Sequence, residues 1–225
     1  IVFVSTVLTN WFEKKTGFAI GLAWALASVA SAIMSPLSVM MIDTMGWRMA
    51  LLVFAIVAAC LAVPAALFIV RYSPERKGMK PYGYDPAAHA EGEAAAGVPF
   101  SKAIRSAAFV LLAFALAATQ IASVINTYFP VYAESVGFAP TVGALMISVA
   151  LIFDIGLNPL VGWTIDKFGA VKAFVAWMAV GILSMVILMG SAGNVIMAYL
   201  GAGLGDVLYV LLGVGIASVA STVFG

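Results

Sequence analysis

Two acidic residues stand inside long apolar runs of this sequence, and they are its clearest candidates for chemistry. Asp154 is followed four positions later by Asn158, which places both side chains on one face of a helix. Asp206 lies in the middle of another apolar run. A carboxyl group at that depth must either carry a proton or pair with a base. Each acid is therefore a candidate proton site or solute contact, and the alternative is a neutral acid that donates one structural hydrogen bond.

Uncharged polar side chains accompany these acids in some apolar runs and are scarce in others. Gln120 and Asn126 lie in the run before Asp154, and we expect them to face the same cavity. Spans that line an aqueous path can hold polar groups, whereas spans that face lipid should not. The runs 47–70 and 172–190 carry almost none, so we expect these two to be peripheral and the other complete runs to surround a cavity.

Composition shows what kind of element must position these residues. The sequence has 225 residues, of which 64% are hydrophobic and 9% charged, against about 25% charged in soluble domains. Continuous apolar runs about 20 residues long are typical of membrane-spanning helices, whereas barrel strands alternate apolar and polar residues. We predict an all-α membrane protein with the end of one span at 1–10 and six complete spans at 17–41, 47–70, 106–131, 141–163, 172–190 and 195–219.

Basic residues predict how the spans are oriented. Of the eleven bases, all but Arg48 fall in loops that the alternation of spans places on one side. The positive-inside rule makes that side cytoplasmic. We expect an integral, multi-pass protein of the lipid bilayer, in a bacterial cytoplasmic (inner) membrane. Its formal net charge of +1 gives no indication of nucleic-acid binding.

The polar stretch 73–103 divides the chain into two helical parts, 1–72 and 104–225. It is rich in proline, glycine and alanine and cannot bury enough apolar surface to fold alone. We therefore interpret it as a cytoplasmic linker. His89 lies in it beside two glutamates, but no second histidine or cysteine is near, so we predict no metal site and no cofactor.

An internal repeat relates the two helical parts. The stretch 35–50 aligns without gaps on 158–173 and places Gly46 opposite Gly169. The distribution of bases puts the two copies on opposite sides of the membrane. Opposite-facing copies are typical of the inverted-topology repeats of transporters.

The loop GWTIDKFG at 162–169 resembles the cytoplasmic loop signature of the major facilitator superfamily. Its motif residues are Gly162, Asp166, Lys167 and Gly169, and Lys172 follows. An acid at this position can cap the start of the next helix and hold a base across the cytoplasmic face. The resemblance implies a part in the conformational cycle for these residues.

A second motif, WFEKK at 11–15, runs into small residues and includes Lys14 and Lys15. It is similar to the start of the fifth span in monocarboxylate transporters and their bacterial oxalate/formate relatives. The resemblance covers essentially the whole chain and implies a partial major facilitator-type bundle, from the end of the fourth span to the end of the tenth. On this reading the other spans belong to the same polypeptide, and we expect that the 225 residues alone do not transport.

The resemblance implies a secondary transporter of a small organic acid, coupled to protons and working by alternating access, and not an enzyme. Monocarboxylate transporters carry an acid and, four residues later, an arginine that holds the substrate carboxylate. Asp154 matches the acid, but Asn158 stands in place of the arginine. A transporter of a neutral or cationic solute is therefore the alternative, and a non-transporting membrane protein is a more remote one.

Overall fold

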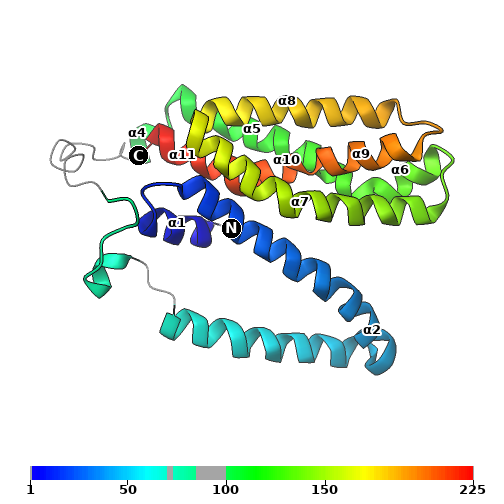
Figure 1. Cartoon of the computed structure of the whole chain (residues 1–225), viewed down its shortest axis with the longest axis horizontal. Helices are drawn as coiled ribbons and strands as arrows, with labels where there is room; N and C mark the ends of the chain where they lie inside the picture. The colour runs from blue at the N-terminus through cyan, green and yellow to red at the C-terminus, as the bar shows by residue number, and fades with distance from the viewer. Residues whose placement is uncertain (1, 70–72, 85–99, 225) are drawn as a thin grey trace.

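The computed structural model describes residues 2–69, 73–84 and 100–224, and this part of the chain forms a bundle of helices (Figure 1). A short helix, α1 (Val2–Trp11), comes first. Six further stretches of the described chain are long and apolar enough to cross a membrane, as predicted. They are Thr16–Met34, Met40–Phe68, Ala107–Ser135, Pro140–Phe168, Ala170–Met189 and Val195–Ala220.

The first two spans form one long element, α2 (Thr16–Pro64), continued by a π-helical turn, η1 (Ala65–Ile69). Gly46, with φ 79° and ψ 155°, interrupts α2, and the chain turns back there (Figure 1). Gly169, its counterpart in the repeat, has φ 88° and ψ 150° between α7 (Pro140–Phe168) and α8 (Ala170–Met189). Only glycine adopts this backbone conformation readily. The two copies of the repeat therefore share one kind of turn.

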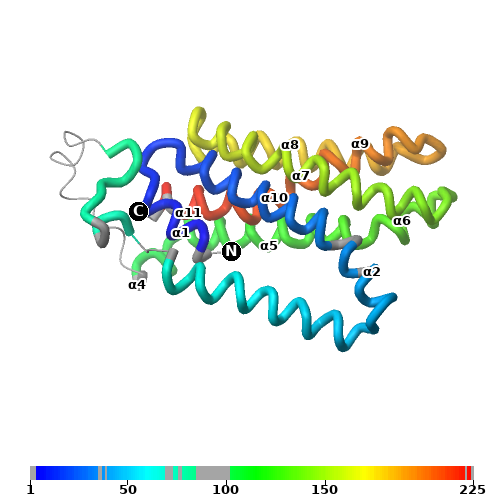
Figure 2. The backbone as a smooth tube through the Cα atoms, turned by 60° about the horizontal axis from the view of Figure 1, so that its bottom comes forward, coloured from blue at the N-terminus to red at the C-terminus, as the bar shows by residue number. Residues whose placement is uncertain are grey.

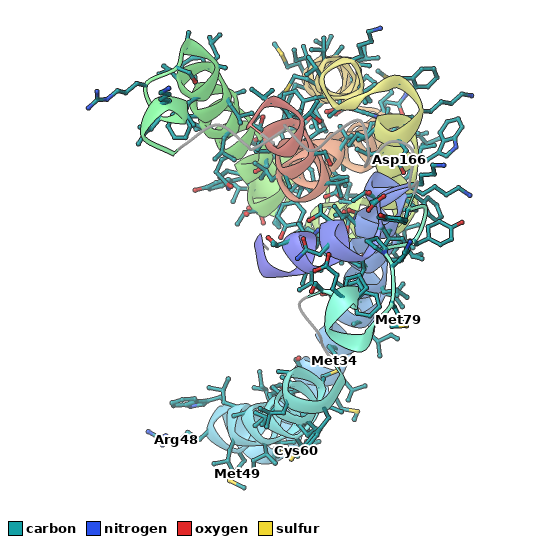
Figure 3. All side chains as sticks on the ribbon, turned by 90° about the vertical axis from the view of Figure 1, so that its left-hand side faces the viewer. Met34, Arg48, Met49, Cys60, Met79 and Asp166 are labelled. Atoms are coloured by element: carbon teal, nitrogen blue, oxygen red, sulfur yellow. The ribbon has the colours of Figure 1, made fainter. Side chains whose placement is uncertain are left out.

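The second arm of α2, Met40–Phe68, is peripheral. The described residues bury none of its most apolar part, and Figure 3 places Arg48, Met49 and Cys60 on an arm that stands apart from the other helices. Its exposed side chains are those of a helix whose solvent is lipid. This agrees with the prediction that the run 47–70 faces lipid.

The predicted span 106–131 is not one straight helix. It begins as α5 (Ala107–Ser123), passes through a 3₁₀ segment, η3 (Val124–Tyr128), and ends as α6 (Phe129–Ser135). Pro130 has no backbone N–H for an α-helical hydrogen bond, so the regular helix is interrupted just before it.

The last span is interrupted as well. It consists of α9 (Val195–Gly205), α10 (Val207–Val210), the π-helical turn η4 (Leu211–Gly215) and α11 (Ile216–Phe224). The break between α9 and α10 falls at Asp206, after a glycine-rich stretch that weakens the helix. Irregular backbone at membrane depth is tolerated where it is buried or lines a cavity.

The first arm of α2 packs very closely on α7, and Figure 2 shows it lying across the bundle while the second arm runs back separately. A Cβ added to Gly17 would lie 2.6 Å from the backbone oxygen of Gly162, and one added to Gly21 would lie 2.2 Å from that of Asn158. Small residues spaced by four along α2 allow this approach. Around it, Ile20, Val161 and Leu211 belong to a buried apolar core.

The described start of the predicted linker is attached to the turn between α1 and α2. It contains a 3₁₀ turn, η2 (Pro74–Lys77), and the Tyr82 N–H donates to the Trp11 carbonyl oxygen at 2.8 Å. The chain is described again from α4 (Phe100–Ala103). His89 lies outside the described residues. The boundaries of the linker, 73–103, stay a prediction.

Candidate functional site

The five predicted site residues gather around two adjoining cavities enclosed by α2, α5, η3, α7 and the last span. The cavities have volumes of about 360 and 290 Å³. Gln120 and Asp154 line both of them, Asn126 and Asp206 line the larger, and Asn158 lines the smaller. No lysine, arginine or histidine is among the described residues that line either cavity.

Asp154 is buried and fully hydrogen-bonded. The Asn158 side-chain amide donates to Asp154 Oδ1 at 2.8 Å and to the Asp154 backbone oxygen at 2.9 Å. The other carboxyl oxygen, Oδ2, is hydrogen-bonded to the hydroxyl of Ser28. Ser28 belongs to α2 and Asp154 to α7, so this bond joins the two helical parts of the chain. Asn158, which replaces the expected arginine, is engaged with Asp154.

Asp206 lies at the break between α9 and α10 and is only 6% exposed. The Asn126 side-chain amide, from η3, donates to Asp206 Oδ1 at 2.9 Å. The second oxygen of Asp206, Oδ2, has no hydrogen-bond partner among the described residues. The carboxyl group of Asp206 lies beside that of Asp154. Two interrupted spans therefore bring an acid and an amide to the same cavity.

Two aromatic residues complete the lining of both cavities. Trp24 of α2 lines both cavities, and its indole N–H has no hydrogen-bond partner in the described part of the chain. Tyr209 was missed by the sequence analysis. Its position three residues after Asp206 was the available signal, because residues spaced by three share a helix face.

At the basic end of the bundle, Asp166 closes the contact between α2 and α7. Its Oδ1 accepts from the Gly17 N–H and its Oδ2 from the Phe18 N–H, both at 2.8 Å. These N–H groups belong to the first turn of α2, where no residue of that turn supplies a side-chain cap. A carboxylate also interacts favourably with the positive end of the helix dipole. Figure 3 shows Asp166 next to the start of α2.

The prediction that Asp166 caps the next helix was wrong. α8 has Gly169 at its N-cap and no side-chain cap, whereas Asp166 caps α2, which is distant in the sequence. The reason is the glycine contact one turn earlier. Because Gly162 lets α7 touch α2 at Gly17, the residue four positions later on the same face meets the N–H groups of α2.

The lysines of the two motifs lie at the exposed surface of the same end. Lys167 Nζ lies 4.7 Å from the centre of the Trp163 ring, within the range of a cation–π contact. Lys172, Lys14 and Lys15 are exposed. Gly162 and Asp166 are the motif residues for which the structure gives a contact between the two helical parts at this end.

The residues of α7 that contact α2 are spaced by four along the helix, from Asp154 to Asp166, and form one face toward α2. We call this contact the α2–α7 seam; it comprises Gly17, Gly21 and Ser28 of α2 with Asp154, Asn158, Gly162 and Asp166 of α7.

Comparison with known proteins agrees with this architecture. All of residues 1–225 match the family model of the Major Facilitator Superfamily, and the chain belongs to that superfamily. It is therefore an integral, multi-pass membrane protein. The chain is also 27% identical over 196 residues to monocarboxylate transporter 11 of Homo sapiens, an alignment that covers 80% of this chain and 38% of that protein. This similarity supports the resemblance to the monocarboxylate transporter branch.

Proposed function

We propose that the chain is part of a proton-coupled secondary transporter of a small organic acid. The observation that carries the proposal is Asp154, which is buried, lines the cavities and is hydrogen-bonded by Ser28 from the other helical part. A titratable group in this position can exchange a proton with the cavity. Because it is bonded to Ser28, a change in its protonation also alters the contact between the two helical parts.

Ser28 supports this role because its hydroxyl has two hydrogen-bond partners. It lies 3.0 Å from the Trp24 backbone oxygen and is also bonded to Asp154. A hydroxyl has one proton to donate. When Asp154 is ionised, Ser28 donates to it. When Asp154 is protonated, the acid donates to Ser28, and Ser28 donates to the Trp24 carbonyl group. The contact thus has a satisfied arrangement for either protonation state.

The charges around the cavities favour co-transport of an anion with a proton. Asp154 and Asp206 are neighbours, and the described lining residues include no base. A solute carboxylate that entered while both acids were ionised would bring three like charges together in a space of low dielectric constant. Protonation removes one of these charges first. We therefore expect the proton to bind before the organic acid.

Alternating access would open and close the seam. The two helical parts, with boundaries at 1–72 and 104–225, would move against each other with 73–103 as their tether. The bonds from Asp166 to α2 and the close glycine contacts hold α2 and α7 together at the basic end. Opening toward the cytoplasm would require both to be released.

Transport of a neutral or cationic solute is the second candidate. Asn158 takes the place of the arginine that would hold a carboxylate, and its amide is already bonded to Asp154. An acidic lining without a base suits a solute that carries no negative charge.

Uptake by the complete polypeptide in proteoliposomes tests the proposal. Small carboxylates are supplied at two pH values to the wild type, to Asp154→Asn and to Ser148→Ala. Ser148 is an exposed hydroxyl on the same helix and serves as the matched control. We expect Asp154→Asn to abolish pH-dependent uptake and Ser148→Ala to preserve it. An unchanged pH response in Asp154→Asn would contradict the role of Asp154, and uptake of amines but not carboxylates would favour the second candidate.

A further inference from the structure

We propose that Asp206 forms the second half of the proton site, and that its Oδ2 shares one proton with the carboxyl group of Asp154. This rests on the proposed function, because it adds a second acid to the same site. In the shared arrangement the proton is bonded to Oδ2 of Asp206 and hydrogen-bonded to the Asp154 carboxylate, which still accepts from Ser28, and the pair carries a single negative charge.

The first observation is the buried oxygen of Asp206 that has no partner. Oδ1 accepts from Asn126, whereas Oδ2 has no hydrogen-bond partner among the described residues and is closed off from solvent. A buried polar atom without a partner is costly. A proton placed on this oxygen would give it a donor function and a hydrogen-bond partner in the neighbouring carboxylate.

The second observation is the carboxyl group beside that of Asp206. The carboxyl group of Asp154 is the neighbour of that of Asp206, and Asp154 is itself held in place by Asn158 and Ser28. Two neighbouring ionised carboxylates repel each other strongly in a buried site. One proton between them replaces that repulsion by a short, charge-assisted O–H···O bond.

The backbone is arranged to bring the two acids together. A Cβ added to Gly203 would lie 2.6 Å from the ring of Phe153, which is the residue before Asp154. α9 therefore touches α7 closely just before the break that presents Asp206. Since a larger residue at 203 would push the two helices apart, this glycine makes the approach of the acids possible.

Among the described residues that face the two acids, no other charged group competes for the proton. The groups that face the pair from α2 are the neutral Trp24 and Ser28, those from α5 and η3 are the amides Gln120 and Asn126, and the last span adds the phenol of Tyr209. On the side of α8, Ser184 packs against Gly205 and is neutral. Asp154 and Asp206 are thus the acids of the cavity lining in the described chain.

The test measures protonation in two ways in the complete polypeptide. The first readout is the pH of half-maximal carboxylate uptake in proteoliposomes. The second is the pH dependence of the infrared C=O stretching band of protonated carboxyl groups, recorded on purified protein without solute. The variants are Asp206→Asn, which removes the acid at constant shape, and Asp206→Glu, which restores it. Ser184→Ala is the control, because it removes a buried hydroxyl that packs against the same helix outside the cavities.

We expect Asp206→Asn to move both midpoints to lower pH by about one unit or more, because the neighbouring carboxylate that favours a proton on Asp154 is gone. Asp206→Glu should return them toward wild type, and Ser184→Ala should leave them in place. In the reciprocal variant, Asp154→Asn, the infrared midpoint of the remaining acid should shift as well, which provides a second test if Asp206→Asn does not fold.

Unchanged infrared midpoints in both single-acid variants would overturn the shared proton and leave Asp206 as a structural acid. That result, together with pH-dependent carboxylate uptake, would leave the proposed function intact. Shifted infrared midpoints in a protein that takes up no carboxylate would support the shared proton and refute the proposed function. The experiment therefore distinguishes failure of the shared proton from failure of the proposed function.

Discussion

Replacing Gly162 by alanine should open the basic end of the α2–α7 seam. A Cβ at this position would lie 2.1 Å from the backbone oxygen of Gly17, where real Cβ contacts do not fall below 3.0 Å. The new Cβ would be attached to the backbone of α7, and the oxygen belongs to the backbone of α2. No flexible side chain can therefore give way. The two helices must therefore move apart by about 1 Å.

The displacement would break the cap that Asp166 provides. Its two hydrogen bonds to α2 are 2.8 Å long, and a further 1 Å or so takes them beyond the range of an N–H···O bond. At a partly exposed helix end the two bonds together stabilise the closed seam by about 1–2 kcal/mol. The ratio of closed to open molecules should therefore fall roughly 5- to 30-fold.

Spin-label distances measure this ratio directly. Labels at Lys14→Cys and Phe168→Cys report on both sides of the basic end, in a background that carries Cys60→Ser. Lys14 and Phe168 are both exposed. Gly156→Ala is the matched control, because it adds the same methyl group to α7 where nothing lies within 4 Å.

We expect a longer mean distance in Gly162→Ala than in Gly156→Ala, in the complete polypeptide reconstituted in lipid. Equal distance distributions in the two variants would refute the reasoning. They would mean that α2 and α7 absorb the methyl group without separating, and that the glycine contact does not hold the basic end shut.

Two further variants test single contacts. Asp166→Asn should lengthen the same spin-label distance less than Gly162→Ala does, because an amide keeps one acceptor for α2 but lacks the charge that favours a helix start; an unchanged distance would argue against the cap. Tyr132→Phe removes the hydroxyl that lies 2.7 Å from Ser191 Oγ, outside the two cavities. Thermal unfolding in detergent should show a loss of about 1 kcal/mol with pH-dependent uptake preserved, and a loss of uptake would place this contact in the transport cycle.

Much of the fold could be predicted because lipid imposes a simple rule on sequence. The six predicted apolar runs correspond to the six stretches that are long and apolar enough to cross a membrane. The interruptions inside spans were harder to predict, although Pro130 was a visible signal for the one at η3. The break at Asp206 follows the glycine-rich stretch of α9, but glycines are frequent in membrane helices, so they did not mark the break in the sequence.

The residues of the candidate site could be predicted from the sequence, but their contact partners could not. Asp154 and Asp206 were recognisable because charges inside apolar runs are rare. That Ser28 would meet Asp154, or that Asp166 would cap α2, depends on which helices approach closely. The Asp166 cap joins residues 149 positions apart, and only the small residues of the seam hinted at the partner helix.

The order of contacts along the seam suggests why a proton and an opening motion should be linked. Ser28 meets Asp154 halfway along α7, and Gly17 meets Gly162 and Asp166 at the basic end. The contacts of α7 lie on one face of a helix described as continuous from Pro140 to Phe168. A continuous helix transmits a displacement from one end of a contact to the other more readily than a loop would. If the proposed function holds, a change at Asp154 would act on the same two helices that Asp166 holds together, and a single helix pair would link protonation in the cavity to closure at the basic end.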